Sequence, residues 1–106
     1  MDAVTAISGS GPAYIFLVIE ALTQAAKKLG LPDDMAETLA RQTVIGSAAL
    51  AASEHTTPAG TLRQNVTSPG GTTEAALNVF MKDERIFDLF CEATQAARDR
   101  SIELQP

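Results

Sequence analysis

The chain has 106 residues, enough for one compact domain with a modest core but too few for two such domains. Hydrophobic residues make up 45% of it and charged residues 20%, a composition typical of a folded globular domain rather than a disordered segment. Its formal net charge of -5 argues against nucleic acid and anionic membrane surfaces as partners, because both would repel it.

The first predicted helix spans about residues 12–29. Pro12 suits the first helical position, where its missing N–H costs nothing, and Gly30 is a typical C-terminal stop. Residues 1–10 before it are small, polar or β-branched and end in a glycine-rich stretch. We therefore expect an irregular entry to this helix rather than more helix.

This helix is apolar on every side between residues 13 and 19, which a surface helix of a small monomer cannot bury alone. The run is far shorter than the roughly 20 residues that cross a bilayer. No signal-peptide pattern accompanies it. The sequence thus predicts a cytoplasmic protein with no membrane segment, in which something covers both faces of the helix.

A second helix is predicted from about Pro32 to Ser53, because proline and two aspartates in its first turn suit the positive end of the helix dipole. Mainly small residues recur along it at three- and four-residue spacing: Ala36, Leu39, Ala40, Thr43, Ser47, Leu50 and Ala51. Such a stripe allows another helix to approach closely.

The rest of the chain predicts a short helix through about Asn65, one over about residues 75–80 and one over about 86–104, with Asp83 as the N-cap of the last. No strand pattern and no internal repeat is present. The predicted fold class is therefore all-α, a helical bundle formed by one domain over residues 1–106.

Residue types that often carry chemistry are isolated in this sequence. Cys91 has no second cysteine and lies in an apolar-periodic segment, so a buried core residue is expected. His55, the only histidine, lies in a polar loop and is expected to be solvated, and no metal site is expected. Ser8–Gly11 lacks the third glycine, the strand and the later acid of a dinucleotide fingerprint, which leaves a helix entry as the interpretation.

The segment 66–73 carries the strongest binding signal. Its glycines open a helix whose first N–H groups point outward at the positive end of the dipole, which is a ready anion site. Because the P-loop lysine is absent, a small carboxylate is favoured over a nucleotide phosphate. On spacing alone, the alternative remains that Pro69–Gly71 only turns the chain and Thr72 only caps a helix.

Three motifs, in this order, resemble the C-terminal domain of the pyrroline-5-carboxylate reductase family: residues 2–14, residues 30–32 and residues 65–73. The resemblance covers essentially the whole chain. It implies an enzyme that reduces 1-pyrroline-5-carboxylate to L-proline with NADPH or NADH, in proline biosynthesis. It also implies that the cofactor is held by an N-terminal Rossmann domain that this sequence lacks, so that this fragment alone is expected to be inactive.

The resemblance further implies an intertwined homodimer whose helical domains complete the active site at their interface, with higher assemblies of dimers possible for the family. The expected substrate-binding residues are Val66, Ser68, Gly70, Gly71, Thr72 and Thr73. The N–H groups of the last three and the Ser68 hydroxyl would hold the substrate carboxylate, and Val66 would pack on the ring. Thr73 would also reach the ring nitrogen as the catalytic residue, either positioning a protonated imine or relaying a proton. Ser8 and Ser10 are candidates for contact with the nicotinamide.

Two other functions remain open. The chain could be a pure homodimerisation module that binds no small molecule when separated from its cofactor domain. It could also belong to a related reductase that acts on another imine or a keto acid. The preference between NADPH and NADH is not determined, because the residues that read the ribose lie outside this sequence.

Overall fold

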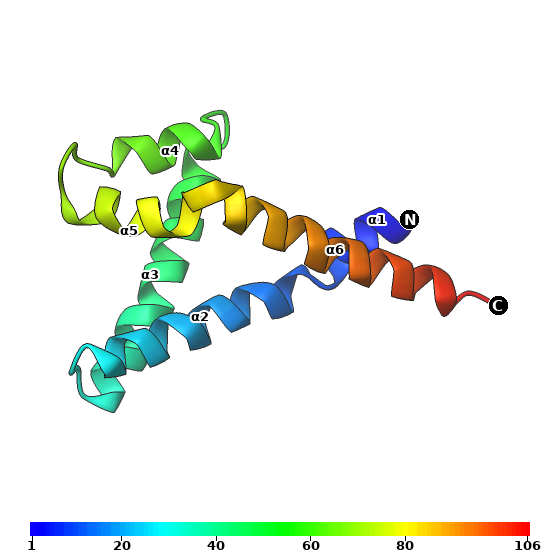
Figure 1. The fold of residues 1–106 in the computed structure, drawn as a ribbon, viewed down its shortest axis with the longest axis horizontal. Coiled ribbons are helices and arrows are strands. Elements are labelled where there is room, and N and C mark those ends of the chain that lie inside the picture. Colours follow the sequence, from blue (N-terminus) through cyan, green and yellow to red (C-terminus); the bar gives the residue numbers. More distant parts are fainter. The chain divides into compact units, whose positions relative to one another are not determined.

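The structure, a computed structural model, describes residues 1–106 and consists of helices without any strand (Figure 1). The all-α prediction is confirmed. The chain divides into two units: residues 12–59 form one, and residues 1–11 together with residues 60–106 form the other. Each unit is described by itself below.

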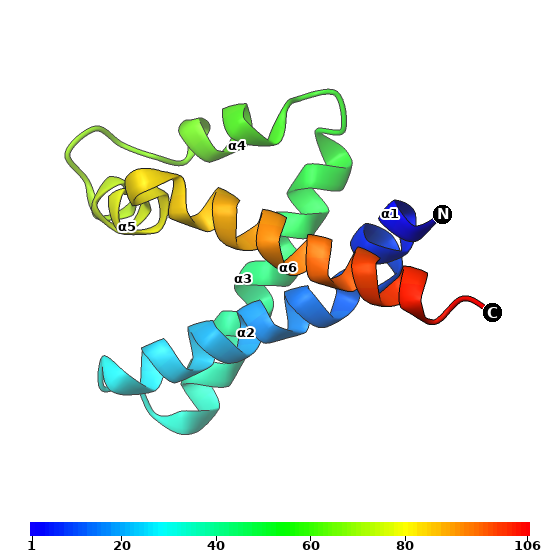
Figure 2. The ribbon, with the colours of Figure 1, turned by 45° about the vertical axis from the view of Figure 1, so that its right-hand side comes forward.

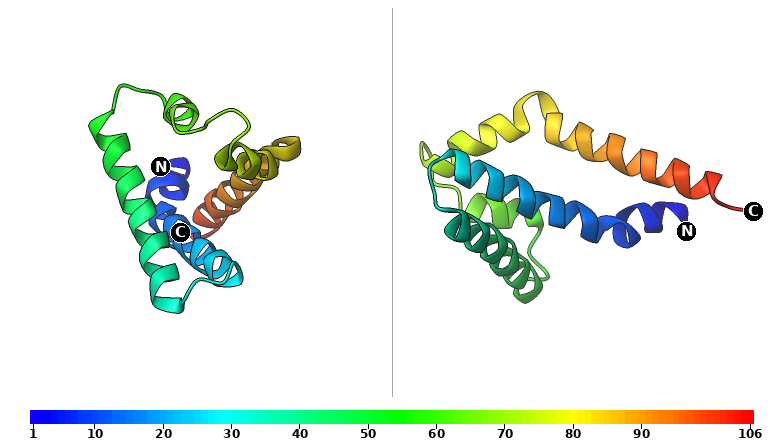
Figure 3. Two further views of the ribbon diagram at one scale, coloured as in Figure 1. Left: turned by 90° about the vertical axis from the view of Figure 1, so that its left-hand side faces the viewer. Right: turned by 90° about the horizontal axis from the view of Figure 1, so that it is seen from below.

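The unit of residues 12–59 is a helical hairpin of α2 (Gly11–Lys28) and α3 (Asp33–Ser53), which meet at a tight loop (Figure 1 and the left-hand view of Figure 3). Both helices end within about a residue of their predicted limits. Gly30 stops α2 with a φ of 98°, while the N–H of Leu31 donates to the carbonyl of Ala26 at 3.1 Å. This is a Schellman closure, in which a left-handed glycine lets the chain return on the last helical carbonyls.

The apolar surface of α2 is largely uncovered. Ile15, Phe16 and Leu17 are 47%, 64% and 63% exposed, although consecutive residues point to different sides of a helix. The buried residues of this unit are Ala36 and Ala40, both on α3. The expectation that α2 needs cover from more than one direction therefore agrees with the structure.

The N-terminal segment of the other unit is helical, and the prediction of an irregular entry was wrong. α1 (Asp2–Val4) continues into a π-helical turn over Thr5–Gly9, which closes with the Ser10 N–H donating to the Thr5 carbonyl at 2.9 Å. This segment packs against α6 (Arg85–Glu103), and Ala6 is 2% exposed there (Figure 2). Tertiary packing thus outweighs the weak local helix propensity of its glycine and β-branched residues.

The remaining helices are α4 (Ala59–Asn65) and α5 (Thr72–Met81), and a 3₁₀ turn over Lys82–Glu84 joins α5 to α6. Asp83 does not cap α6 as predicted. Asp83 and Glu84 have φ values of 54° and 60°, and Glu84 holds the N-cap position without a side-chain hydrogen bond. The chain bends so sharply here that both residues take the left-handed conformation, which sets the angle between α5 and α6.

Cys91 is exposed on α6, so the prediction of a buried core cysteine is wrong for the single chain. It lines a surface hollow where α6 meets the N-terminal segment, together with Ala3, Ala6, Ile7, Thr94, Gln95 and Arg98. The apolar periodicity of this helix is real, but this unit supplies too little protein to cover it.

The helical path from Asp2 to Lys28 is long and apolar enough, by length and composition alone, to cross a membrane. The prediction of no membrane segment used the short run 13–19, and that length argument does not hold for the whole path. An uncovered apolar helix is also what a helix-to-helix interface requires.

Candidate functional site

The segment that leads into the candidate site begins with a closed helix end. At the last turn of α4, the Thr67 hydroxyl donates to the Arg63 carbonyl at 2.6 Å, and the Thr67 N–H donates to the Gln64 carbonyl at 3.0 Å. Carbonyls that the helix would leave without partners are therefore bonded by one residue. This fixes the start of the loop that follows.

The glycine turn of the loop is held by its own backbone. The Gly71 N–H donates to the Ser68 carbonyl at 3.0 Å, and Gly70 between them has a φ of 73°. Proline followed by a glycine of positive φ is the pattern of a type II turn. A Cβ on Gly71 would come within 3.1 Å of the Ser68 carbonyl oxygen, so both glycines have a steric reason.

The turn delivers the chain into α5 with an open N-terminus. Gly71 is the N-cap, in an extended conformation and without a side-chain cap, and the Ala75 N–H donates to its carbonyl at 3.2 Å. Thr72 is the first helical residue, so the alternative that its side chain only caps the helix is wrong. The N–H groups of Thr72 and Thr73 have no carbonyl to bond within the helix, because such a partner lies four residues back.

Glu74 is a residue of this site that the sequence analysis did not identify. Its Oε1 accepts the Gly70 N–H at 3.2 Å, reaching back over the first turn of α5. A glutamate three residues after an N-cap is a known helix-start signal and could have identified it. A carboxylate already occupies part of the loop, and the N–H groups of Thr72, Thr73 and Glu74 are left for a ligand.

The side chains expected to touch a substrate lie on the surface of the single chain. Val66 is 64% exposed, and Ser68, Thr72 and Thr73 are also exposed. The three surface hollows described for this chain are formed by other residues. Any ligand at this loop would therefore need further protein to enclose it.

The structure does not bring Ser8 and Ser10 to this loop within one chain. Both lie at the N-terminal segment, where the Ser8 hydroxyl donates to the Val4 carbonyl at 3.0 Å, and this segment packs on α6 near Cys91 and Arg98. The loop lies at the outer end of α5, beyond the start of α6 (Figure 1 and the right-hand view of Figure 3). The two sets of candidates occupy opposite ends of their unit.

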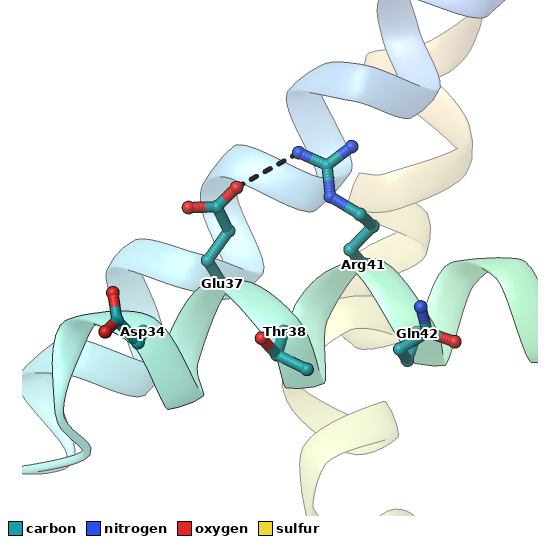
Figure 4. Close-up of a pocket in the computed structure, with 5 residues that line it drawn as sticks. All are labelled: Asp34, Glu37, Thr38, Arg41 and Gln42. Atoms are coloured by element: carbon teal, nitrogen blue, oxygen red, sulfur yellow. Dashed lines mark hydrogen bonds and ion pairs between the residues drawn. The ribbon is translucent and has the colours of Figure 1, made fainter.

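Two hollows of the hairpin unit are weak binding candidates. One lies on a single face of α3, lined by Asp34, Glu37, Thr38, Arg41 and Gln42, and it includes an exposed ion pair of 3.1 Å between Glu37 and Arg41 (Figure 4). A hollow on one helix has no opposite wall, and exposed ion pairs contribute little. The other hollow, between α2 and α3, shares this ion pair and is also rich in polar residues.

The titratable groups do not form a metal site. The structure contains no group of three histidine, cysteine, aspartate or glutamate residues that could hold a metal ion. His55 is exposed in the loop after α3.

Comparison with known proteins gives one consistent family. A family model described as pyrroline-5-carboxylate reductase dimerisation matches residues 1–104. The chain is 50% identical over 105 residues to a pyrroline-5-carboxylate reductase of Pseudomonas aeruginosa, covering 98% of this chain and 37% of that protein. It is 48% identical over 103 residues to one of Arabidopsis thaliana, with 97% and 37% covered.

Solved structures show the same likeness. A pyrroline-5-carboxylate reductase of Coxiella burnetii matches with a TM-score of 0.91 at 48% identity, covering 99% of this chain and 38% of that one. A pyrroline carboxylate reductase of Plasmodium falciparum with NADP bound matches with a TM-score of 0.85 at 38% identity, covering 95% and 38%. The chain thus spans well under half the length of the proteins that it matches.

Proposed function

The chain belongs to the pyrroline-5-carboxylate reductase dimerisation family, and from this premise we propose that it is the dimerisation and substrate-binding part of such a reductase. The proposed enzyme reduces 1-pyrroline-5-carboxylate to L-proline with NADPH or NADH, in the cytoplasm. The observation that carries the proposal is the glycine turn of residues 68–71, which opens α5 with outward N–H groups suited to a carboxylate.

The substrate carboxylate is received at the first turn of α5. The N–H groups of Thr72 and Thr73 and the Ser68 hydroxyl are its donors, and the positive end of the helix dipole adds to their attraction. The N–H groups of Gly70 and Gly71 already bond Glu74 and Ser68. The two glycines therefore contribute mainly by shaping the turn, and their N–H groups join only if these internal bonds exchange.

The rest of the substrate is a five-membered ring with a C=N bond. Val66, 64% exposed beside the turn, offers an apolar surface to the ring carbons. The Thr73 hydroxyl positions the ring nitrogen, which enters already protonated, so no strong acid is required from the protein. When bound, the nicotinamide supplies the hydride that the imine carbon accepts.

This chain does not offer a dinucleotide site of its own. It is all-α, whereas nicotinamide dinucleotides are commonly held at the carboxyl edge of a parallel sheet. We assign the cofactor to a separate domain of the full-length enzyme and leave Ser8 and Ser10 as the residues here that could meet the nicotinamide.

A homodimer accounts for two observations at once. The exposed apolar residues of α2 require a partner, and a second copy supplies it. The N-terminal segment and the glycine turn lie apart in one chain, so an active site that uses both takes one from each copy. We propose this arrangement, in which the site is complete only in the dimer.

A pure homodimerisation module is the second candidate. The exposure of Val66, Ser68 and Thr73 favours it, because a fragment with an open site could dimerise without holding any ligand. A related reductase with another imine or keto acid as substrate would use the same turn and carboxylate contacts. Of the expected substrate-binding residues, only Val66 and Thr73 would differ in role between such a reductase and a pyrroline-5-carboxylate reductase.

The test is a residue-resolved NMR titration of this chain with L-proline, with D-proline and acetate as controls. Selective shifts at Ser68 and residues 70–73 with L-proline support the substrate site. Equal shifts with acetate indicate an unspecific anion site. If no residue responds up to high millimolar L-proline, the fragment is a dimerisation module in isolation, and full-length enzyme with Thr73→Val becomes the decisive assay.

A further inference from the structure

The two ends of the chain are joined by a side-chain contact. Asp2 Oδ1 accepts the Ser101 hydroxyl at 2.7 Å, and both carboxylate oxygens accept the Gln105 Nε2 group at 2.9 and 3.0 Å. Asp2 is the first residue of α1, whereas Ser101 lies in the last turn of α6. We call these three residues the Asp2 contact.

Asp2 lies in a segment that packs with α6 rather than with the helix that it leads into. The helical path runs almost without interruption from Asp2 to Lys28, yet residues 1–11 belong with residues 60–106, and the unit boundary falls before Pro12. The π-helical turn Thr5–Gly9 lies immediately before that boundary. A π-helical turn is an irregular point at which a helix can change direction, and such turns are frequent at functional positions.

The packing beside the Asp2 contact is thin. Ala6 is the buried residue of this unit, and Val4 and Ile7 in the same segment remain 60% and 62% exposed. Apolar burial alone therefore holds the segment weakly on α6. The hydrogen bonds of Asp2 therefore contribute a larger part of the free energy that holds this segment on α6 than they would in a well-packed helix pair.

We propose that Asp2 is a positioning residue for the reductase reaction: through Ser101 and Gln105 it holds the N-terminal segment on α6 and so sets the orientation of the cofactor-binding domain over the substrate site. This inference rests on the proposed function and on the N-terminal position that the family resemblance implies for the cofactor-binding domain. In the proposed dimer the site takes its glycine turn from the other copy, so the segment that Asp2 holds on α6 sets the cofactor-binding domain over the turn of the second copy.

The chemistry of the contact suits a carboxylate. Ionised Asp2 is purely an acceptor, and it meets an O–H donor and an NH₂ donor. The Ser101 hydrogen bond is the main cause that lowers the pKa of Asp2, with a smaller contribution from Gln105 and against partial desolvation. Asparagine retains one acceptor oxygen, whereas alanine retains none. Asp2→Asn should therefore weaken the Asp2 contact in part, and Asp2→Ala should remove it.

The test uses full-length enzyme carrying Asp2→Ala, Asp2→Asn or Ser101→Ala, with Asp99→Ala as the matched control. Asp99 also carries a carboxylate, but it lies on α6 and its partner is the exposed Arg98 at 3.4 Å. We expect Asp2→Ala to lower kcat about fivefold, with KM for the imine within about twofold of the wild type, since orientation rather than substrate binding is lost. Asp2→Asn should retain more of the activity, and Asp99→Ala should retain all of it.

Two further readouts separate positioning from general damage. Adding Ser101→Ala to Asp2→Ala should cost nothing more, because Asp2→Ala already removes the bond that Ser101 makes. Amide hydrogen exchange of residues 2–10 should be faster in Asp2→Ala than in Asp99→Ala, with the rest of the enzyme unchanged. Additive losses, an unchanged kcat, or unchanged exchange would each overturn the proposal.

The same experiment keeps this inference apart from the proposed function. If wild-type full-length protein does not reduce 1-pyrroline-5-carboxylate, the proposed function fails, and with it the kinetic role of Asp2. Hydrogen exchange then still decides whether the Asp2 contact holds the segment on α6. If the wild type is active and Asp2→Ala is equally active, only the positioning role is wrong.

Discussion

The segment of residues 66–74, which contains the glycine turn of residues 68–71, and the helix α2 differ in how they obtain their structure. Every hydrogen bond described in the turn joins residues at most four apart, from Thr67–Arg63 to Gly70–Glu74. α2 instead shows exposed apolar side chains on its sides and has little cover in its own unit. The turn is thus defined by its local sequence, whereas α2 depends on protein that a single copy does not contain.

This difference separates two kinds of functional surface. The hydrogen-bond donors of a carboxylate site made of backbone N–H groups can all lie in one short segment, because the turn itself orients them. An interface made of apolar side chains is buried only when its partner is bound. Changes in α2 should therefore abolish assembly, while changes in the turn should affect substrate and leave the dimer intact.

The largest effect is expected from a charge on α2. Leu17→Asp places a carboxylate on a residue that is 63% exposed in one chain and buried in the proposed dimer. Desolvating an unpaired charge costs several kcal/mol, so we expect the dimer to dissociate at micromolar concentrations. Sedimentation velocity measures this, with Gln64→Asp at an exposed glutamine of α4 as the control. A dimer that survives Leu17→Asp would place the interface elsewhere.

The second effect concerns Thr73. Thr73→Val keeps the shape of the side chain and removes the hydroxyl that we assign to the ring nitrogen. A hydrogen bond to a charged group contributes about 1.5–3 kcal/mol, so kcat of the full-length enzyme should fall about 10- to 100-fold. Thr61→Val, at an exposed threonine of α4, should change nothing. An unchanged kcat would exclude both positioning and proton relay by Thr73.

A smaller effect is expected from the turn itself. Gly70 has a φ of 73°, so Gly70→Ala forces an L residue into the left-handed region at a cost of about 1–2 kcal/mol. We expect KM for the imine to rise about tenfold while the dimer persists. Gly60→Ala, at a helical glycine with no atom within 4 Å of the added Cβ, is the control and should be neutral or slightly stabilising. An equal rise in both variants would contradict a special role for Gly70.

The features that could be predicted from the sequence are those set by neighbouring residues, and the features that could not be predicted depend on distant contacts. The limits of α2 and α3 were predictable because Gly30 and Pro32 end and begin helices through local backbone geometry. Pro69 and the two glycines after it indicated the turn for the same reason. The helical state of residues 2–9 was not predictable, since the Asp2–Ser101 bond that helps hold it joins residues 99 apart.

The environment of Cys91 was misjudged for a related reason. Periodicity shows which face of α6 is apolar, but it does not say whether the same chain covers that face. Glu74 has a local sequence signal, its position three residues after the N-cap, but its carboxylate only accepts hydrogen bonds and so does not resemble a donor to an anionic ligand. The roles of Val66, Ser68 and Thr73 stay predictions until substrate is bound.

The smallest expected effect, at Glu74, sharpens the comparison most. Its carboxylate helps to hold the turn through the Gly70 N–H at 3.2 Å, yet it also repels an incoming carboxylate. A lost cap costs about 1 kcal/mol, whereas screening reduces repulsion between exposed charges to a fraction of that. Glu74→Ala should therefore raise KM about three- to fivefold, whereas Glu74→Gln, which keeps an acceptor oxygen, should leave KM unchanged or slightly lower.

The informative result is which of the two Glu74 variants has the higher KM for the imine. Asp88→Ala provides the control, because Asp88 is also an acidic residue in the first turn of a helix and contributes only through the dipole. If both Glu74 variants lower KM, the glutamate competes with substrate for the turn, and the turn needs no support from its side chain. If only Glu74→Ala raises KM, the turn depends on the bond between the Gly70 N–H and the Glu74 carboxylate, four residues apart. The turn is then stabilised by its own neighbouring residues, whereas α2 is not.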